Sequence, residues 1–309
     1  MSFDSGTISF RLFHLQQPRT PRIIEALAKR AAPPIDTLDR DPISGWASGQ
    51  SPLDRNITDQ KCVIGPYLHV QWMKAEKKIP ASLLKAHLKQ EEEAERNARG
   101  VAFLPRIWKA AIKTRVIAEL QPKMQPTLTT IPAALNLISD LLIATALSDN
   151  QIDTLCQAIK TTTGAHPILI TPETAALKRK NINARDLPPT VFSPDPAINP
   201  TAEPTLGMDF LTWLWYTWEK EARLHRLPDG RTFGFILEGP VTFYHQGQGA
   251  HEVALRHGIP LNSREAGTTL LCGKKLKRAK IIIAHNDGIY TATLDDTFAI
   301  RSLKLPKGE

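Results

Sequence analysis

Apolar residues recur at helical spacing in two consecutive segments of the first half of the chain, separated by Arg99-Gly100. Each segment begins near a proline, which suits a first helical turn because its missing N–H is not needed there. A spacing of 3.6 residues puts one set of residues on one side of each segment. These sets are Leu83, His87, Ala94 and Ala98 in the first segment and Leu104, Ile107, Trp108, Ala111 and Ile112 in the second. The pattern predicts two amphipathic helices within about 79–120.

Cations occupy the opposite sides of both predicted helices. In the first helix they are Lys85, Lys89, Arg96 and Arg99, with only Glu92 among them, and in the second Arg106, Lys109 and Lys113. A surface helix often carries cations for solubility alone. Two interpretations therefore stay open at this point, a solvated face and a face that binds a polyanion.

The remaining pattern of the first half predicts strands and helices without strict alternation. Alternation predicts a strand at 6–15, and a helix is expected at 20–31. Residues 32–60 are rich in Pro, Asp, Ser and Gly and are predicted as a loop in which Trp46 is a buried anchor. Further expected elements are a hairpin at 63–73, strands at 127–137, 141–146 and 166–171, and a helix from Ser148 to about 162. This order favours an α+β fold with antiparallel sheets over a parallel doubly wound sheet.

A proline-rich segment at 183–205 is typical of an extended connection between two units. We therefore predict an N-terminal unit at 1–182, whose helical projection is about 79–120, and a C-terminal α+β unit at 206–309. The second unit is expected to open with a helix whose Phe210, Trp213, Leu214 and Trp218 form a core face, with a base-stacking surface as the alternative. Strands are expected near 232–238, 240–245, 251–256, 279–285, 288–294 and 298–305, with a helix at 263–271.

Composition narrows the class of partner. The 309 residues carry a formal net charge of +8, which points to a polyanionic partner. The sequence contains no apolar run of 18 residues and no apolar N-terminal segment, so neither a membrane span nor a secretory signal is expected. Three cysteines at distant positions indicate a reducing cytoplasm instead of a disulfide framework.

The patterns that suggest catalysis are incomplete. Gly267 to Lys274 resembles a phosphate-binding loop, but five residues separate its glycines and a lysine follows Lys274, where a magnesium-binding hydroxyl is needed. His245, His251 and His257 recur every six residues, a spacing that suits metal ligands on neither a strand nor a helix. Carboxylates such as Asp140 and Asp295 are scattered. We therefore predict a non-enzymatic protein with no cofactor and no metal.

What remains is electrostatic binding to DNA without base recognition. Cations that neutralise phosphates release condensed counterions, and nothing in the sequence has the features of a recognition helix. A second basic cluster follows the phosphate-loop-like segment. The alternative to DNA binding for this cluster is a solvated helix end, where cations interact favourably with the C-terminal dipole of the helix. The complete candidate set for DNA binding is Lys77, Lys78, Lys85, Lys89, Arg96, Arg106, Lys109, Lys113, Lys274, Lys275, Lys277 and Arg278.

Three segments in order resemble the bacterial RdgC family of recombination-associated proteins. They are the run from Lys78-Ile79-Pro80 to Glu93, the element Leu104-Pro105-Arg106-Ile107-Trp108, and residues 140–159. The resemblance covers about 60–170. It implies a ring-shaped homodimer whose positive central hole encircles duplex DNA in the nucleoid and which restrains a RecA-type recombinase.

The resemblance also assigns roles to particular residues. It implies that Trp108 lies at a gate contact between subunits and that Arg106 points at the hole. The alternatives to this function are a metal-dependent exonuclease in DNA repair and a protein-interaction adaptor that docks through the helix of Trp213 and Trp218.

Overall fold

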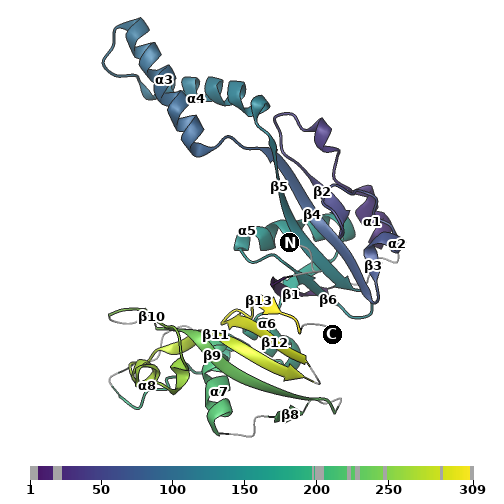
Figure 1. Ribbon diagram of the computed structural model, residues 1–309, viewed down its shortest axis with the longest axis vertical. Helices are drawn as coiled ribbons and strands as arrows, with labels where there is room; N and C mark the ends of the chain where they lie inside the picture. Colours follow the sequence, from purple (N-terminus) through teal and green to yellow (C-terminus); the bar gives the residue numbers. More distant parts are fainter. Residues whose placement is uncertain are drawn as a thin grey trace. The chain divides into compact units, whose positions relative to one another are not determined.

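The computed structural model of the chain describes residues 6–16, 23–196, 198, 205–220, 224–226, 230–245, 249–285 and 288–306. The chain divides into two compact units. Unit 1 takes in the described residues of 1–18, 134–160 and 164–309, and unit 2 those of 19–133 and 161–163. Figure 1 shows the elements of both units.

Unit 2 contains a small antiparallel sheet. The strand β4 (Tyr67–Lys77) pairs with β2 (Ile43–Ser48) and with the short β3 (Val63–Ile64), and β5 (Pro126–Asn136) begins on its other side. The helices α1 (Ile23–Lys29) and α2 (Asp59–Cys62) and the turn η1 (Ile35–Thr37) complete this part. The predicted helix at 20–31 is confirmed from Ile23 onward, and its first residues lie outside the described ranges.

The indole of Trp46 anchors unit 2, as predicted, but it lies on a strand. Its ring is 1% exposed, meets Trp72 edge to face at 5.3 Å, and donates through Nε1 to Thr162 Oγ1 at 2.8 Å. The prediction of a loop throughout 32–60 was therefore wrong at β2. The misleading residue is Gly45, where a Cβ would lie 2.5 Å from the Ala32 Cα, so the strand needs a glycine for close backbone approach.

The two predicted helices are confirmed as α3 (Ala81–Arg99) and α4 (Arg106–Leu120), followed by the turn η2 (Gln121–Lys123). Pro80 and Pro105 each precede the first helical residue. Gly100 ends α3 in the left-handed region at φ +63°, which a glycine adopts without a Cβ penalty. In Figure 1 the pair projects from the end of β4 and returns to the start of β5.

Unit 1 is built on a long antiparallel sheet with the order β10-β9-β11-β12-β13-β1-β6, to which β7 adds at β1 and β8 at β9. The strands are β1 (Ile8–Gln16), β6 (Leu141–Ala144), β7 (His166–Leu169), β8 (Leu224–Arg226), β9 (Thr232–Tyr244), β10 (Glu252–Leu255), β11 (Lys275–His285), β12 (Gly288–Asp295) and β13 (Ile300–Lys304). The α+β class with antiparallel sheets is confirmed.

The helices of unit 1 begin with α5 (Asp149–Thr163), whose predicted N-cap Ser148 forms a capping box with Gln151. The others are α6 (Pro172–Lys180), α7 (Leu206–Lys220) and α8 (Arg264–Leu271), with the turns η3 (Ala184–Asp186) and η4 (Pro260–Asn262). The sequence pattern had not predicted α6. None of the helices in the described part of the chain is long and apolar enough to cross a membrane.

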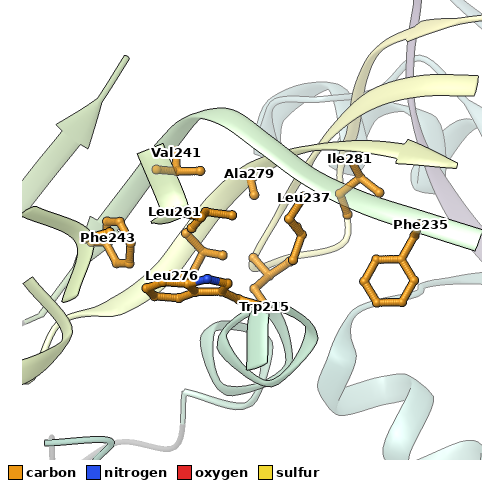
Figure 2. Packing of buried hydrophobic residues seen from close by; sticks show 11 residues of the cluster. Trp215, Phe235, Leu237, Val241, Phe243, Leu261, Leu276, Ala279 and Ile281 are labelled. Carbon is orange, nitrogen blue, oxygen red and sulfur yellow. The ribbon is translucent and has the colours of Figure 1, made fainter. Parts of the chain in front are cut away.

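The core of unit 1 forms where α7 packs on β9 and β11 (Figure 2). Leu211 and Trp215 are the buried residues of the helix that meet this core, at 0% and 7% exposure. Trp213 is 49% exposed, so its prediction as a core residue was wrong. Apolar residues fill almost every position from 210 to 216, and periodicity alone therefore cannot choose the buried face. The side chain of Trp218 lies outside the described residues.

Residues 183–196 of the proline-rich segment, which we call the connecting segment, pack against the C-terminal elements. The hydroxyl of Ser193 donates to the Leu271 carbonyl at 2.5 Å. The ammonium of Lys275 donates to Thr190 Oγ1 at 2.9 Å. These contacts hold the segment beside α8 and the start of β11.

Candidate nucleic-acid interface

The helices α3 and α4 enclose a small apolar core of their own. Its buried residues are Leu104, Ile112, Val116 and Leu120, all in or next to α4, and Leu84 and Leu88 of α3 pack against them. The packed side of α3 therefore differs from the predicted one, because Ala94 and Ala98 are exposed. Leu84 and Leu88 lie one turn apart on the side nearest α4, and contact with that helix decides which side is buried.

Two ion pairs cross between the helices on different sides of this core. Glu92 Oε2 lies 3.7 Å from Lys109 Nζ, and Glu91 Oε2 accepts from Arg115 Nη2 at 2.6 Å. Successive helical residues are about 100° apart, so Glu91 and Glu92 mark two different edges of α3. The Glu92–Lys109 pair thus identifies one edge of the helix pair.

The predicted basic residues gather at the edge marked by Glu92 and Lys109. On α3, Lys85 lies seven residues before Glu92 and Lys89 three residues before it. Arg96 lies four residues after Glu92. On α4, Arg106 and Lys113 stand three residues before and four after Lys109. Residues at these spacings are neighbours on one helix side. We call this set the basic edge: Lys85, Lys89, Arg96, Arg106, Lys109 and Lys113.

The side chains of the basic edge are accessible to a ligand. Five of the six residues are exposed, and Arg96 is half-buried. Lys109 keeps 52% of its side-chain surface despite its contact with Glu92. An exposed pair of this kind contributes little to stability and leaves the positive field of the neighbouring cations in place.

Arg99, which the pattern had placed with these cations, has a different role. Its guanidinium carbon lies 3.9 Å above the Trp108 ring centroid, and its Nε donates to Glu95 Oε1 at 2.6 Å. The contact covers the indole with a cation and ties the end of α3 to the start of α4. Trp108 is consequently half-buried at the α3–α4 core.

The most exposed apolar side chains at the tip of the helix pair are Phe103, which the sequence pattern did not single out, and Ile107, which it placed on the apolar face. Phe103 is 88% exposed and Ile107 is 80% exposed. Ile107 had been expected on the same apolar face as Trp108. The two are about 100° apart around α4, so the core takes Trp108 and leaves Ile107 in solvent. The signal for Phe103 was its position in the loop between two predicted helices, where no helix face can bury it.

Lys77 and Lys78 lie where β4 leads into α3. Lys78 is exposed, and Lys77 donates to the Pro122 carbonyl at 3.4 Å. A hydrogen bond from Lys74, together with its charge and that of Lys78, holds the pKa of Glu76 below its usual value. The base of the helix pair is thus rich in cations, although Lys77 is partly engaged with backbone.

The second predicted cluster is dispersed by the fold. Lys275 is 5% exposed, and its ammonium donates to Asp209 Oδ1 at 2.5 Å and to Thr205 Oγ1 at 2.7 Å. Lys277 lies 4.3 Å from the Tyr244 ring centroid and 3.9 Å from Glu252 Oε2. We therefore leave Lys275 out of any DNA-binding surface, because a buried and paired ammonium cannot reach a phosphate.

The two remaining cations of the second cluster are more accessible. Arg278 is exposed on β11, and Lys274 is half-buried directly before that strand. Successive residues of a strand point to opposite faces, and the register of β11 against β9 shifts between Leu276 and Arg278. Even the accessible cations of this cluster therefore do not form a row like the basic edge.

Asp295, one of the scattered carboxylates, accepts hydrogen bonds within the fold. Burial opposes ionisation of Asp295, but hydrogen bonds from Thr297 and Ala299 hold its pKa below the usual value. Burial and the neighbouring Asp295 raise the pKa of Asp296. Across the described ranges, no three His, Cys, Asp or Glu residues are grouped closely enough to hold a metal ion.

Comparison with known proteins identifies a family for more than half of the chain. A family model described as "Putative exonuclease, RdgC" matches residues 8–180, which is more than half of the chain. None of the curated proteins matches.

Proposed function

The chain belongs to the RdgC family, and we propose that it binds double-stranded DNA without sequence preference, encircles it as a homodimer and modulates homologous recombination by restraining a RecA-type recombinase. The observation that carries the DNA-binding part is the basic edge. Six cations from two helices stand along one edge of the pair, and the Glu92–Lys109 contact holds the helices in that register.

The dimensions of the basic edge suit a phosphate backbone. Lys85 and Arg96 are eleven residues apart in α3, or about 16 Å along the helix axis. Each strand of B-DNA carries one phosphate per about 3.4 Å of duplex axis, so this distance corresponds to roughly five phosphates. Ammonium and guanidinium groups on long side chains contact phosphates without reading base edges, and the expected binding is therefore independent of sequence.

The exposed tip of the helix pair supports the dimer part of the proposal. Phe103 and Ile107 present apolar side chains to solvent, and Trp108, the next residue along α4, is covered by Arg99 and packs on the α3–α4 core. We propose that two copies meet tip to tip, with Phe103 and Ile107 at the contact and Trp108 as its support. Such a contact would close a ring around DNA whose lining includes the basic edge.

A salt series tests the DNA-binding proposal. The expected result for the wild type is a linear fall of log K with log salt, with equal affinities for duplexes of unrelated sequence. The variant with Lys85, Lys89, Arg106 and Lys113 all changed to Glu should lose affinity for every sequence. Its salt slope should be smaller by about 3 to 4, because each neutralised phosphate contributes about 0.9.

A matched control separates local contacts from net charge. Lys29, Arg30, Arg40 and Arg55 are exposed cations of unit 2 outside α3 and α4, and changing all four to Glu alters net charge equally. This control should bind duplex nearly as the wild type does. Equal losses in both variants would refute the basic edge as the binding surface.

A mass measurement in solution, with Phe103→Asp as the variant, tests the dimer. The wild type should have twice the mass of the chain, and the variant should not.

Nuclease activity is the second candidate function, because the matched family is described as an exonuclease. It predicts loss of nucleotides from the ends of a labelled linear duplex in the presence of magnesium or manganese. Intact duplex after long incubation with either metal would dismiss it. The adaptor alternative stays a prediction as well: Trp215 is buried, but Trp213 on the same helix is half-exposed.

A further inference from the structure

The last ten residues of the connecting segment, 187–196, belong to no helix or strand. We call them the strap. Four of the ten are prolines, which have no N–H to donate. All ten residues are exposed or half-buried. The strap also lies beyond residues 8–180, which the family model matches. Its place on the fold therefore depends on a small number of side-chain contacts.

The strap covers part of the aromatic side of α7. Phe192 lines a hollow of about 400 Å³ together with residues of α7 and α8. The helix residues are Thr212, Trp213, Trp215, Tyr216 and Leu270. Trp215 is 7% exposed, whereas Phe192 is 39% exposed. Because the hollow leaves the Phe192 ring incompletely packed, moving this ring into solvent costs less than moving a ring out of a close-packed core.

The first contact that holds the strap is a hydrogen bond from the buried ammonium of Lys275 to Thr190 Oγ1, at 2.9 Å. The same ammonium donates to Thr205 Oγ1 at 2.7 Å and to Asp209 Oδ1 at 2.5 Å. When Thr190 moves away, the ammonium keeps these two partners, and one of them carries the opposite charge. Opening of the strap therefore avoids the large penalty of an unpaired buried cation.

The second contact is the hydrogen bond from the Ser193 hydroxyl to the Leu271 carbonyl at 2.5 Å. Leu271 is the last residue of α8 and is 52% exposed. A carbonyl in the last turn of a helix has no partner within the helix, and water commonly hydrates it. Release of Ser193 therefore leaves no buried polar group without a hydrogen bond.

We infer that the strap is a latch that opens while the rest of unit 1 stays folded, and that its opening exposes the aromatic side of α7, including Trp215. Both contacts of the latch break without leaving an unsatisfied group inside the fold. Segments with few buried apolar contacts and no regular hydrogen bonding open at lower free energies than the whole fold. The device does not depend on the proposed DNA-binding function.

Cleavage by chymotrypsin after Phe192 tests the latch, because the protease reaches this bond only when the ring has left the hollow. The test variant combines Thr190→Val with Ser193→Ala, which removes both hydrogen bonds and keeps Phe192. This variant should be cleaved about tenfold faster than the wild type, since two hydrogen bonds no longer hold the closed state. Its melting temperature should stay close to that of the wild type. Peptides of residues 187–196, with and without the two changes, correct for the intrinsic cleavage rate.

Thr154→Val is the matched control. It removes a threonine hydroxyl from another element of unit 1, where the hydroxyl donates to the Asn150 carbonyl at 2.7 Å. This control should be cleaved after Phe192 at the wild-type rate. Fluorescence of the dye ANS, which binds exposed apolar surface, is the second measurement. The double variant should bind more ANS than the wild type and the control do.

Equal cleavage rates of the double variant and the wild type would overturn the inference. Cleavage after Phe192 that begins only at the urea concentration where unit 1 unfolds would also overturn it, since the strap would then not open separately. Wild-type cleavage as fast as that of the free peptide would show that no closed state exists. Faster cleavage of the double variant without a gain in ANS fluorescence would refute the exposure of α7.

A single change keeps the test valid if the double variant does not fold. Ser193→Ala removes only the contact with Leu271 and leaves the buried Lys275 with all three of its partners. It should speed cleavage after Phe192 by about threefold, because one hydrogen bond is lost. A wild-type rate in this folded variant would overturn the inference.

Discussion

The basic edge of α3 and α4 and the basic cluster at the start of β11 are built from the same residue types, yet their cations meet different surroundings. Lys85 and Lys89 project from a helix that buries no residue completely. Lys275 enters the sheet and is paired with Asp209, and Lys280 pairs with Glu238. A thin helix pair keeps its cations in solvent, whereas a sheet covered by helices encloses or neutralises many of them.

This difference shows that a run of cations predicts a binding surface only where the packing leaves the charges unpaired and on one side. In α3 and α4 the helical repeat brings cations together at one edge. In β11 the strand repeat alternates them between two faces. The same net charge therefore has opposite consequences for a polyanionic partner.

The largest expected effect is on duplex affinity. Changing Lys85, Lys89, Arg106 and Lys113 to Glu should weaken duplex binding by about 10³-fold near 0.1 M salt, because four phosphate contacts are lost. Changing Lys274, Lys277 and Arg278 to Glu should weaken it by less than about tenfold, since these cations do not form a row. Filter binding or fluorescence anisotropy at fixed salt measures both. A larger loss from the second variant would reverse the comparison.

The next largest effect is on the free energy of unfolding and concerns the buried ion pair of Lys275 and Asp209. Asp209→Asn leaves the Lys275 ammonium buried beside a neutral amide, and unfolding should become easier by about 3 kcal/mol. Glu92→Gln removes an exposed partner of Lys109 and should change stability by less than about 1 kcal/mol. Denaturant unfolding monitored by tryptophan fluorescence compares the two. Similar losses would show that the Lys275 site is wetter than its burial indicates.

A smaller effect is expected at the junction of α3 and α4. Arg99→Ala removes the cation over Trp108 and the bond to Glu95, and should raise amide exchange in 95–110 by about two- to fivefold, from a loss of about 0.5–1 kcal/mol. Arg96→Ala, on the basic edge, is the control for loss of one helix cation. Hydrogen exchange read by mass spectrometry separates them, and equal exchange in both variants would contradict a special role for Arg99.

The smallest effect is on pH dependence. Burial, with Lys178 and Arg179, lowers the pKa of His14, and burial, with Lys274 and Lys275, lowers the pKa of His245. The unfolded chain takes up protons at these residues below about pH 6.5 while the folded chain does not, so stability should fall as the pH drops from 7 to 5. The double variant His14→Gln and His245→Gln should show a smaller fall in melting temperature. An unchanged fall would assign the acid sensitivity to other groups.

Much of the fold followed from local patterns. Pro80 and Pro105 mark the starts of two helices, and Gly100 marks the end of one. Ser148 forms a capping box with Gln151. These signals act within one or two helical turns, and the structure confirms them. The strand β2 escaped prediction because the close approach of Gly45 to Ala32 is a long-range requirement that makes a strand resemble a loop.

Only part of the candidate site could be predicted from local sequence patterns. The sequence identified Lys85, Lys89 and Arg106 as cations of amphipathic helices, since their spacing fixes a common side. It misplaced Arg99, whose partner Trp108 belongs to another helix, and it took Lys275 for a surface residue although Asp209 lies 66 positions away in the chain. In both cases the partner lies more than one helical turn away in the sequence, so local periodicity does not reveal it.

What the sequence by itself determined about this protein is therefore the identity and the local order of its helices, strands and charges. Only the tertiary structure decided which of two equally apolar residues, Trp213 or Trp215, was buried in the core and which stayed half exposed. The physical reason is that helical and strand repeats constrain neighbours along the chain, whereas burial and ion pairing depend on which surface each element meets.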